Sequence, residues 1–228
     1  MKRHLVPVSG SPYIIQRLLV FCGSCWLLAS WIMVIGLRQP MLPTTQTWLP
    51  GVRMMLIMSA IGLVVVWPMA ALSTSRDVPP RTTLRHTVIL LITAQLITWP
   101  SGFVTTWLFS RTALIAITLT GWGLLAGVIT AWGRSRARFW PRSISMLICL
   151  MLTIVSPILV LMDESIRSAI PFSPLTSLWY LAGGGLYDTT SREWIAGLAP
   201  WLIALASWPL ISRAGGCPEQ PKAGHWRT

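Results

Sequence analysis

Long apolar stretches alternate with short polar links along the chain, and this pattern predicts its architecture. Each stretch has about twenty residues, enough for a helix rising ~1.5 Å per residue to cross a hydrocarbon core of ~30 Å. The stretches 56–72 and 143–162 also lack the polar stripe of a helix on a soluble protein. We therefore predict an all-α integral membrane protein with six transmembrane helices, over residues 18–37, 52–72, 87–109, 113–132, 143–162 and 193–212.

Basic residues are unevenly distributed over the links between these predicted helices. When the links are assigned alternately to two sides, one side holds thirteen of the 18 Lys and Arg residues and the other holds five. Because cytoplasmic links are enriched in Lys and Arg, the distribution predicts that both termini are cytoplasmic. The five exceptions on the predicted outer side are Arg38, Arg53, Arg111, Arg167 and Arg192.

Composition favours a membrane protein over a soluble one. Hydrophobic residues make up 54% of the chain and charged residues 11%, which leaves too little polar surface for a water-soluble globule. A net charge of +12 would suggest a nucleic-acid partner in a soluble protein. Here the charges sit beside predicted spans, where topology and lipid headgroups account for them. We expect a multi-pass protein of the inner or plasma membrane, in contact with lipid and without a nucleic-acid partner.

The pattern indicates one polytopic domain, residues 1–212, followed by a disordered cytoplasmic tail, residues 213–228. The first apolar stretch is longer than the ~7–15 residues of a signal-peptide core, so it is expected to remain as the first span. Within it, Cys22 and Cys25 have the C-x-x-C spacing of redox sites. Their position inside a predicted span favours small packing residues over a reactive pair.

Prolines inside the predicted spans indicate kinks, because proline removes one backbone hydrogen bond and clashes with the preceding turn. Pro100, followed by Gly102, is the strongest candidate for a broken helix. Pro68 and Pro209 are further candidates in the second and sixth spans. A static kink that shapes packing is favoured over a functional hinge.

The fourth predicted span contains Gly123 and Gly127, a G-x-x-x-G pair that permits two helices to approach closely. Packing within the chain is the expected use of this pair. Dimerisation with a second copy is the alternative.

The link between the fifth and sixth spans contains a further apolar segment. Residues 170–182 are too few to cross a membrane but suit a re-entrant or interfacial helix. Ser173 before Pro174 is typical of a helix start, and the glycines at 183–185 are typical of a helix end. We predict a short helix inserted shallowly in the outer leaflet, not a seventh span.

Residues suited to catalysis or cofactor binding are scarce in this sequence. The three histidines cannot pair across spans to hold haem, and there is no H-E-x-x-H motif, Cys/His metal cluster or P-loop. Ionisable side chains within spans usually mark ion or proton pathways, whereas the deepest strongly polar side chain here is Gln95. We expect no enzyme activity, no cofactor and no metal, and a proton-coupled transporter is disfavoured.

Six spans, cytoplasmic termini and an apolar segment between the last two spans together resemble the permease subunit of ABC-2-type exporters. The likeness is closest over residues 129–182, where the phrase at 171–178 (Pro-Phe-Ser-Pro-Leu-Thr-Ser-Leu) is similar to the Asn-Pro-Leu-Thr phrase of that family. The resemblance implies a separate P-loop ATPase chain as partner. The chain departs from the family where Pro79 and Pro80 interrupt the segment on which that ATPase docks, and only a short stretch precedes the first span.

Two basic links on the predicted cytoplasmic side, residues 73–86 and 133–142, are the candidate docking surface for such a partner. Their arginines could instead only set topology and contact lipid headgroups. The alternative function is a non-catalytic accessory or assembly subunit of a larger membrane complex, which suits 14 Trp residues and few polar span residues. The docking candidates are Arg76, Asp77, Arg81, Arg85, Arg134, Arg136, Arg138 and Arg142.

Overall fold

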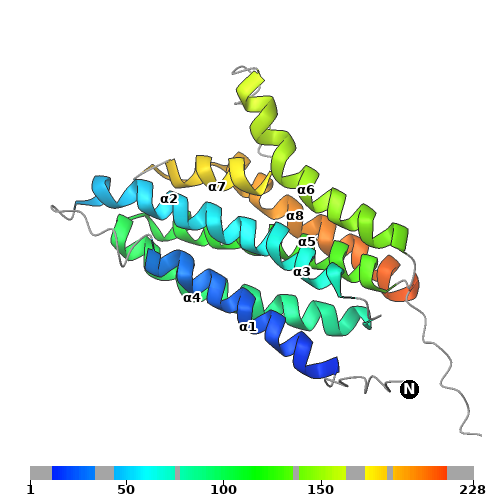
Figure 1. The fold of residues 1–228 in the computed structure, drawn as a ribbon. Helices are drawn as coiled ribbons and strands as arrows, with labels where there is room; N and C mark the ends of the chain where they lie inside the picture. Colours follow the sequence, from blue (N-terminus) through cyan, green and yellow to red (C-terminus); the bar gives the residue numbers. More distant parts are fainter. Residues whose placement is uncertain are drawn as a thin grey trace, which may run out of the picture.

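The computed structural model describes residues 12–33, 44–74, 78–135, 139–162, 173–183 and 187–214. Within these ranges all regular structure is helical, and five helices are long and apolar enough to cross a membrane. Figure 1 shows the helices packed side by side in a bundle. The chain is therefore a multi-pass membrane protein with an all-α fold, as predicted.

Five spanning helices match the second to sixth predicted stretches. α1 (Pro12–Trp31) matches the first, but its apolar part that the structure describes fully, Arg17–Trp31, is shorter than the others. The count of six spans therefore stays a prediction. The spanning helices are α2 (Thr45–Ile61) continued by the π-helix η2 (Gly62–Val66) and α3 (Trp67–Ser73), then α4 (Pro80–Thr105), α5 (Phe109–Arg134), α6 (Phe139–Met162) and α8 (Ser191–Ala214).

Successive spanning helices run in opposite directions, so the chain links between them gather at two ends of the bundle. We call one of them the α7 end, because it holds the short helix α7 (Pro174–Gly183), the α4–α5 turn and the starts of α2 and α8. The opposite end holds the ends of α3 and α5 and the starts of α4 and α6. Figure 1 places the start of α1 and the end of α8 at this opposite end as well.

Several helices begin before the residue that hydropathy predicted. α4 begins at Pro80 rather than at residue 87, because proline is well suited to the first helical position. Residues 80–86, predicted as part of a link, are therefore the first turns of α4. The predicted link at 110–112 is wrong as well, since α5 begins at Phe109 and the turn covers residues 106–108. Thr106 makes this turn with a left-handed backbone (φ 52°) and donates its N–H to Gly102 O.

α5 is the most deeply buried of the spanning helices and packs against α4, α6, α7 and α8. Gly127 lies so close to α4 that a Cβ would be 2.5 Å from Thr87 Cγ2. A Cβ on Gly123 would likewise be 2.5 Å from Leu91 Cδ2. The G-x-x-x-G pair is therefore used for packing within the chain, as expected. Gln95 is also used there, since its Nε2 donates to Ala116 O at 3.1 Å.

The proline candidates do not interrupt their helices. α4 continues through Pro100 and Gly102 to Thr105, so the predicted broken helix is not found. α8 likewise continues past Pro209 to Ala214. Before Pro68 the helix widens into the π-helix η2, which accommodates a residue that lacks an N–H donor and has a bulky ring.

The clearest bend is in α6, a helix whose proline was not among the kink candidates. Figure 1 shows the last turns of α6 leaving the direction of the rest of that helix and pointing away from the bundle. Pro157 lies inside α6 near this region and supplies the cause of the bend. Leu161 and Met162 beyond it are exposed.

Candidate functional site

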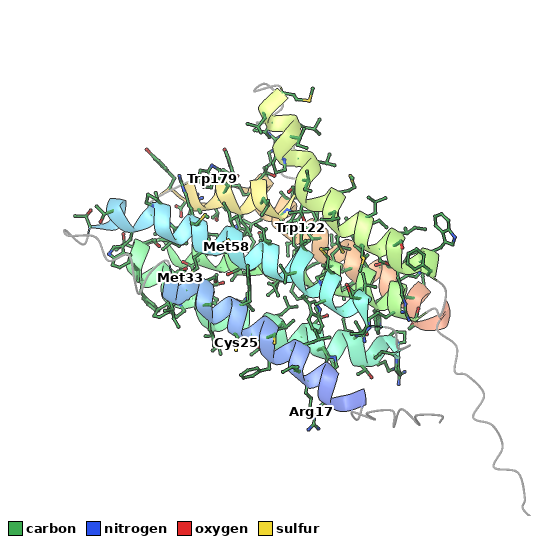
Figure 2. The ribbon with its side chains drawn as sticks, in the orientation of Figure 1. Arg17, Cys25, Met33, Met58, Trp122 and Trp179 are labelled. Atoms are coloured by element: carbon green, nitrogen blue, oxygen red, sulfur yellow. The ribbon has the colours of Figure 1, made fainter. Side chains whose placement is uncertain are left out.

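The short helix predicted between the last two spans is present as α7, Pro174–Gly183. Ser173 Oγ accepts the backbone N–H of Leu175 at 3.4 Å, and Pro174 is the first helical residue, as the sequence indicated. Leu178 is fully buried, whereas Trp179 and Tyr180 are exposed. α7 therefore has one face packed on the bundle and an aromatic face turned outward, on which Figure 2 labels Trp179.

α7 extends along the bundle rather than lying across its end. Its start contacts the middle of α6, because Ser173 Oγ donates to Thr153 O at 3.3 Å and Thr176 shares a 2.9 Å hydroxyl hydrogen bond with Ser156. Thr153 lies nine residues before Met162, which corresponds to ~13 Å along α6. The last turn of α7 is level with the first turn of α5, where Arg111 binds the carbonyl of Leu181. These contacts favour the re-entrant placement of α7 over the interfacial one. They also favour a deeper start of the helix than the shallow insertion we expected.

A cavity of about 1060 Å³ lies between α7 and its neighbours α2, α5, α6 and α8. This volume reaches the upper end of the ~300–1,000 Å³ range of ligand pockets. One part of the wall is apolar and is formed by Ile57, Pro157, Val160 and Leu175. The other part carries charge from Arg53, Arg111, Asp188, Arg192 and Glu193.

Arg111 is a structural clamp in this wall. Its side chain is buried at 2% exposure, and it donates to Leu181 O at 3.0 Å and to Tyr187 O at 3.2 and 2.9 Å, with a longer bond of 3.4 Å to Asp188 O. Its Nη1 also lies 3.8 Å from Glu193 Oε1. Arg111 thus ties the backbone on both sides of the α7–α8 link to the start of α5, and its charge faces an acid.

Glu193 is held in turn by the start of α8. Its Oε2 accepts the backbone N–H of Thr190 at 2.7 Å, and Thr190 Oγ1 accepts the N–H of Glu193 at 3.3 Å. This reciprocal pair is a capping box, which satisfies N–H groups at the start of a helix. The Glu193 carboxylate therefore serves a helix cap and Arg111 together.

Arg53 differs from Arg111 in what surrounds its charge. Its guanidinium lies over the Trp179 ring, 5.0 Å from the ring centroid, in a cation–π contact worth about 0.5–2 kcal/mol. Within the described residues it has no hydrogen bond or ion pair, and its Nε is buried without an acceptor. Placing an arginine at the centre of a spanning helix costs about 2.5–3.5 kcal/mol of insertion free energy. Arg53 is a cation at the cavity wall whose N–H donors have no acceptor among the described residues.

The packing around Arg53 positions it rather than neutralising it. Gly183 ends α7 beside the guanidinium, and a Cβ there would lie 2.7 Å from Arg53 Nη2. The Trp179 ring covers the guanidinium from another side. Gly183 thus leaves room for the guanidinium and the Trp179 ring packs against it, while its N–H groups stay available.

The predicted docking residues fall into two groups at the opposite end. Arg81 and Arg85 are exposed on the first turns of α4. Arg134 is buried at 1% exposure and donates to Thr74 Oγ1 at 3.1 Å, while Arg142 Nη1 donates to Thr74 O at 3.1 Å. These two arginines tie α5 and α6 to the end of α3 and are not a free surface. Arg76, Asp77, Arg136 and Arg138 lie outside the described residues.

Cysteine and histidine side chains are scattered in the part of the chain that the structure describes. Cys22 and Cys25 are free thiols exposed on the surface of α1, so their packing role stays a prediction, and Cys149 is buried in α6. His86 lies edge-on to Trp67, with ring centroids 6.4 Å apart. No group of three or more His, Cys, Asp or Glu side chains comes together among the residues searched.

Sequence reasoning missed the cavity residues, although a signal for them was present. Arg53, Arg111 and Arg192 are three of the five basic residues that oppose the charge bias, and all three line the cavity. The other two, Arg38 and Arg167, lie outside the described residues. The arginines on the predicted outer side, which is otherwise poor in basic residues, were thus a marker of this site.

Comparisons of this chain with protein-family models, curated proteins and solved structures found no match. The cavity, α7 and the arginines at the two ends are therefore the features on which a functional assignment rests.

Proposed function

We propose that this chain is the membrane-embedded permease subunit of an ABC-2-like exporter that works with a separate ATPase chain. In this proposal α1 is a sixth span, both termini are cytoplasmic, and the cavity at the α7 end opens toward the outer side of the cell membrane. The observation that carries the proposal is the short helix α7, which packs against the middle of α6 and lines a cavity of about 1060 Å³ together with residues of the spanning helices.

A half-length helix at membrane depth has a physical cost that a cavity can justify. Irregular backbone is tolerated at that depth only where protein buries it or where it lines a water-filled space. Transporters repeatedly build substrate sites from such interrupted segments. Here Ser156 and Thr153 satisfy the hydroxyls of Thr176 and Ser173 at the deep end of α7, so the helix start is stabilised inside the bundle.

α6 supplies a side of the cavity that is suited to opening. It is the least buried of the spanning helices, and Pro157 and Val160 from its bent part line the cavity. Movement of this part would widen the space between α6 and α7 without disturbing the buried contacts of α5. This supports a path for substrate between the cavity and the lipid.

The opposite end supports the assignment of the cytoplasmic side and of the ATPase contact. Arg81 and Arg85 are exposed on helical turns there, where a soluble partner could bind them. The start of α1 and the end of α8 lie at the same end in Figure 1. The positive-inside bias supports a cytoplasmic position for this arginine-rich end.

The test is affinity purification of the full chain from its native membrane. We expect a P-loop ATPase to co-purify, and Arg81→Ala with Arg85→Ala, or Arg136→Ala with Arg138→Ala, to reduce its recovery at unchanged yield of the chain. The buried pair Arg134 and Arg142 remains in both variants to maintain the fold. Arg17→Ala is the matched control, because Arg17 is exposed at the same end but points away from the bundle (Figure 2).

An accessory or assembly subunit is the second candidate function, favoured by the exposed apolar surface of α6. Phe139, Trp140, Leu161 and Met162 are each at least 75% exposed. Such a surface suits either lipid or other membrane subunits. If the unmodified chain co-purifies in a fixed ratio with membrane proteins and never with an ATPase, the permease proposal is wrong and this alternative takes its place.

A further inference from the structure

We infer that the cavity at the α7 end binds the phosphate group of a membrane-embedded amphiphile, with Arg53 as the anchoring cation and the apolar wall as the seat of its hydrocarbon chain. The inference names a ligand class for the site used in the proposed function. As a substrate assignment it rests on that function, but the binding itself requires no ATPase.

Of Arg53 and Arg111, Arg53 is the cation of the cavity wall that has no acidic partner among the described residues. The guanidinium of Arg111 already faces Glu193 and donates four hydrogen bonds to carbonyl oxygens, so its charge and its donors are in use. Arg53 has the Trp179 ring and no acid among the described residues. An anion from outside the described chain would therefore bind Arg53 in preference to Arg111.

The chemistry of the guanidinium selects the anion. Arginine presents a planar fork of N–H donors that matches the oxygens of phosphate and carboxylate groups with two parallel hydrogen bonds. The Trp179 ring packs against this fork, and Gly183 leaves room beside it. In a bilayer the abundant anion at the headgroup level is lipid phosphate.

Arg53 lies at a depth that suits contact with a lipid headgroup rather than with a hydrocarbon chain. Tyr180 and Tyr187 are exposed at the same end, and Tyr and Trp are enriched at the membrane–water boundary. Arg53, beside Trp179 and Gly183, lies at the level of this aromatic layer. A phosphate at the guanidinium would therefore stay close to water while the rest of the ligand extends inward.

The apolar half of the cavity separates an amphiphile from a free anion. Ile57, Pro157, Val160 and Leu175 form this half, and α6 bends away beside it (Figure 1). A free phosphate would leave these side chains facing empty or wet space, whereas a hydrocarbon chain would cover them. The volume of about 1060 Å³ exceeds what a phosphate ion alone fills.

The inference is tested by native mass spectrometry of the full-length chain, purified in detergent and stripped of lipid. Three probes separate the contributions: phosphatidylglycerol has phosphate and chains, diacylglycerol has chains only, and inorganic phosphate has no chain. We expect one phosphatidylglycerol to bind with a Kd at least about tenfold lower than that of either other probe. Equal binding of diacylglycerol, or phosphate alone binding as tightly as the lipid, would overturn it.

Variants connect the binding to Arg53. Arg53→Gln should raise the phosphatidylglycerol Kd about tenfold, because a charge-assisted pair is lost. Gly183→Ala keeps every charge but places a methyl group against Nη2, so it should weaken binding as well. Trp179→Phe retains an aromatic face and should change the Kd much less. Arg81→Gln, which removes an exposed charge at the opposite end, should leave it unchanged.

Outcomes for the ligand and for the proposed function are distinguishable. If Arg53→Gln elutes as folded protein and binds phosphatidylglycerol as well as the unmodified chain, the inference is wrong whether or not an ATPase co-purifies. Should Arg53→Gln fail to fold, equal binding of phosphatidylglycerol and diacylglycerol by the unmodified chain would still overturn the inference. Arg53-dependent lipid binding without any ATPase partner would keep the site and remove the permease proposal.

Discussion

The indole N–H of Trp201 on α8 donates to the carbonyl oxygen of Ile117 on α5 at 2.9 Å. Gly121, one turn further along α5, provides the space for the ring, since a Cβ there would lie 2.6 Å from Trp201 Cδ1. Lipid offers apolar side chains much the same surroundings as a helix interface does, so close packing and interhelical hydrogen bonds set which helices associate. This contact is therefore a main determinant of how α8 joins the bundle.

Gly121→Ala should destabilise the protein, because the new methyl group overlaps the Trp201 ring. Overpacking of this kind typically costs about 1–3 kcal/mol. Trp201→Phe alone should cost about 1 kcal/mol through the lost hydrogen bond. The double variant should be more stable than the sum of the two predicts, because the smaller ring relieves the overlap.

Thermal unfolding in detergent measures this coupling. Ala29→Val, a change of similar size at an exposed position on α1, is the control and should leave the unfolding temperature nearly unchanged. Strict additivity of Gly121→Ala and Trp201→Phe would show that the two residues do not interact as described.

Arg111→Ala should be among the most damaging single substitutions. It leaves the carbonyl oxygens of Leu181 and Tyr187 without their donor and leaves Glu193 without its cation. Loss of one partner from a buried charged network costs about 3–5 kcal/mol. The yield of monodisperse protein and its unfolding temperature should both fall.

Arg111→Lys tests the geometry of the same network. Lysine keeps the charge but cannot reach three separate carbonyls with a planar fork, so its effect should be intermediate. Arg81→Ala, an exposed arginine, should behave like the unmodified chain. A yield and unfolding temperature of Arg111→Ala equal to those of Arg81→Ala would contradict the clamp.

The spanning helices were predictable because their apolar runs are long, but their starts were not. Hydropathy left Arg81, Arg85, Arg111 and Arg142 outside the predicted spans, whereas all four lie in the first two turns of helices. Arg111 and Arg142 are tolerated there because backbone carbonyls of other segments accept their N–H groups. Those acceptors are distant in sequence, so no local pattern reveals them.

α7 should show graded depth when spin labels are placed along it. We expect a label at position 176 to lie deeper than one at 180, and 183 to be shallowest, because the start of α7 contacts the middle of α6. Accessibility to oxygen and to a water-soluble relaxation agent, measured in nanodiscs, gives the depth. Equal depth at all three positions would indicate a helix lying flat on the membrane.

Cysteine labelling tests the six-span topology. After Cys22, Cys25, Cys149 and Cys217 are replaced, a single cysteine at position 45 should react with an impermeant reagent added outside the cell. A cysteine at position 225 should react only after the membrane is opened. The reverse result at either position would exclude the proposed orientation.

The candidate site was only partly predictable from the sequence. The start of α7 could be predicted from Ser173 and Pro174, which carry a local helix signal. The role of Arg53 could not, because it depends on Trp179 and Gly183, which lie more than a hundred residues away and meet it only when α2 packs against α7. Arg134 was predicted as a docking residue but is instead bonded to Thr74, and that partner too is distant in the sequence.

The π-helix at Gly62–Val66 has a further consequence for the opposite end. There the N–H of Trp67 bonds to Gly62 O, so one residue more than usual fits into the turn. Each residue of a regular helix advances its azimuth by about 100°, but the wider turn absorbs the extra residue, so the residues that follow keep the phase of a regular helix one residue shorter. Thr74 faces Arg134 and Arg142 in that phase. Deleting a single residue between Gly62 and Val66 should therefore restore a regular helix and leave Thr74 facing both arginines.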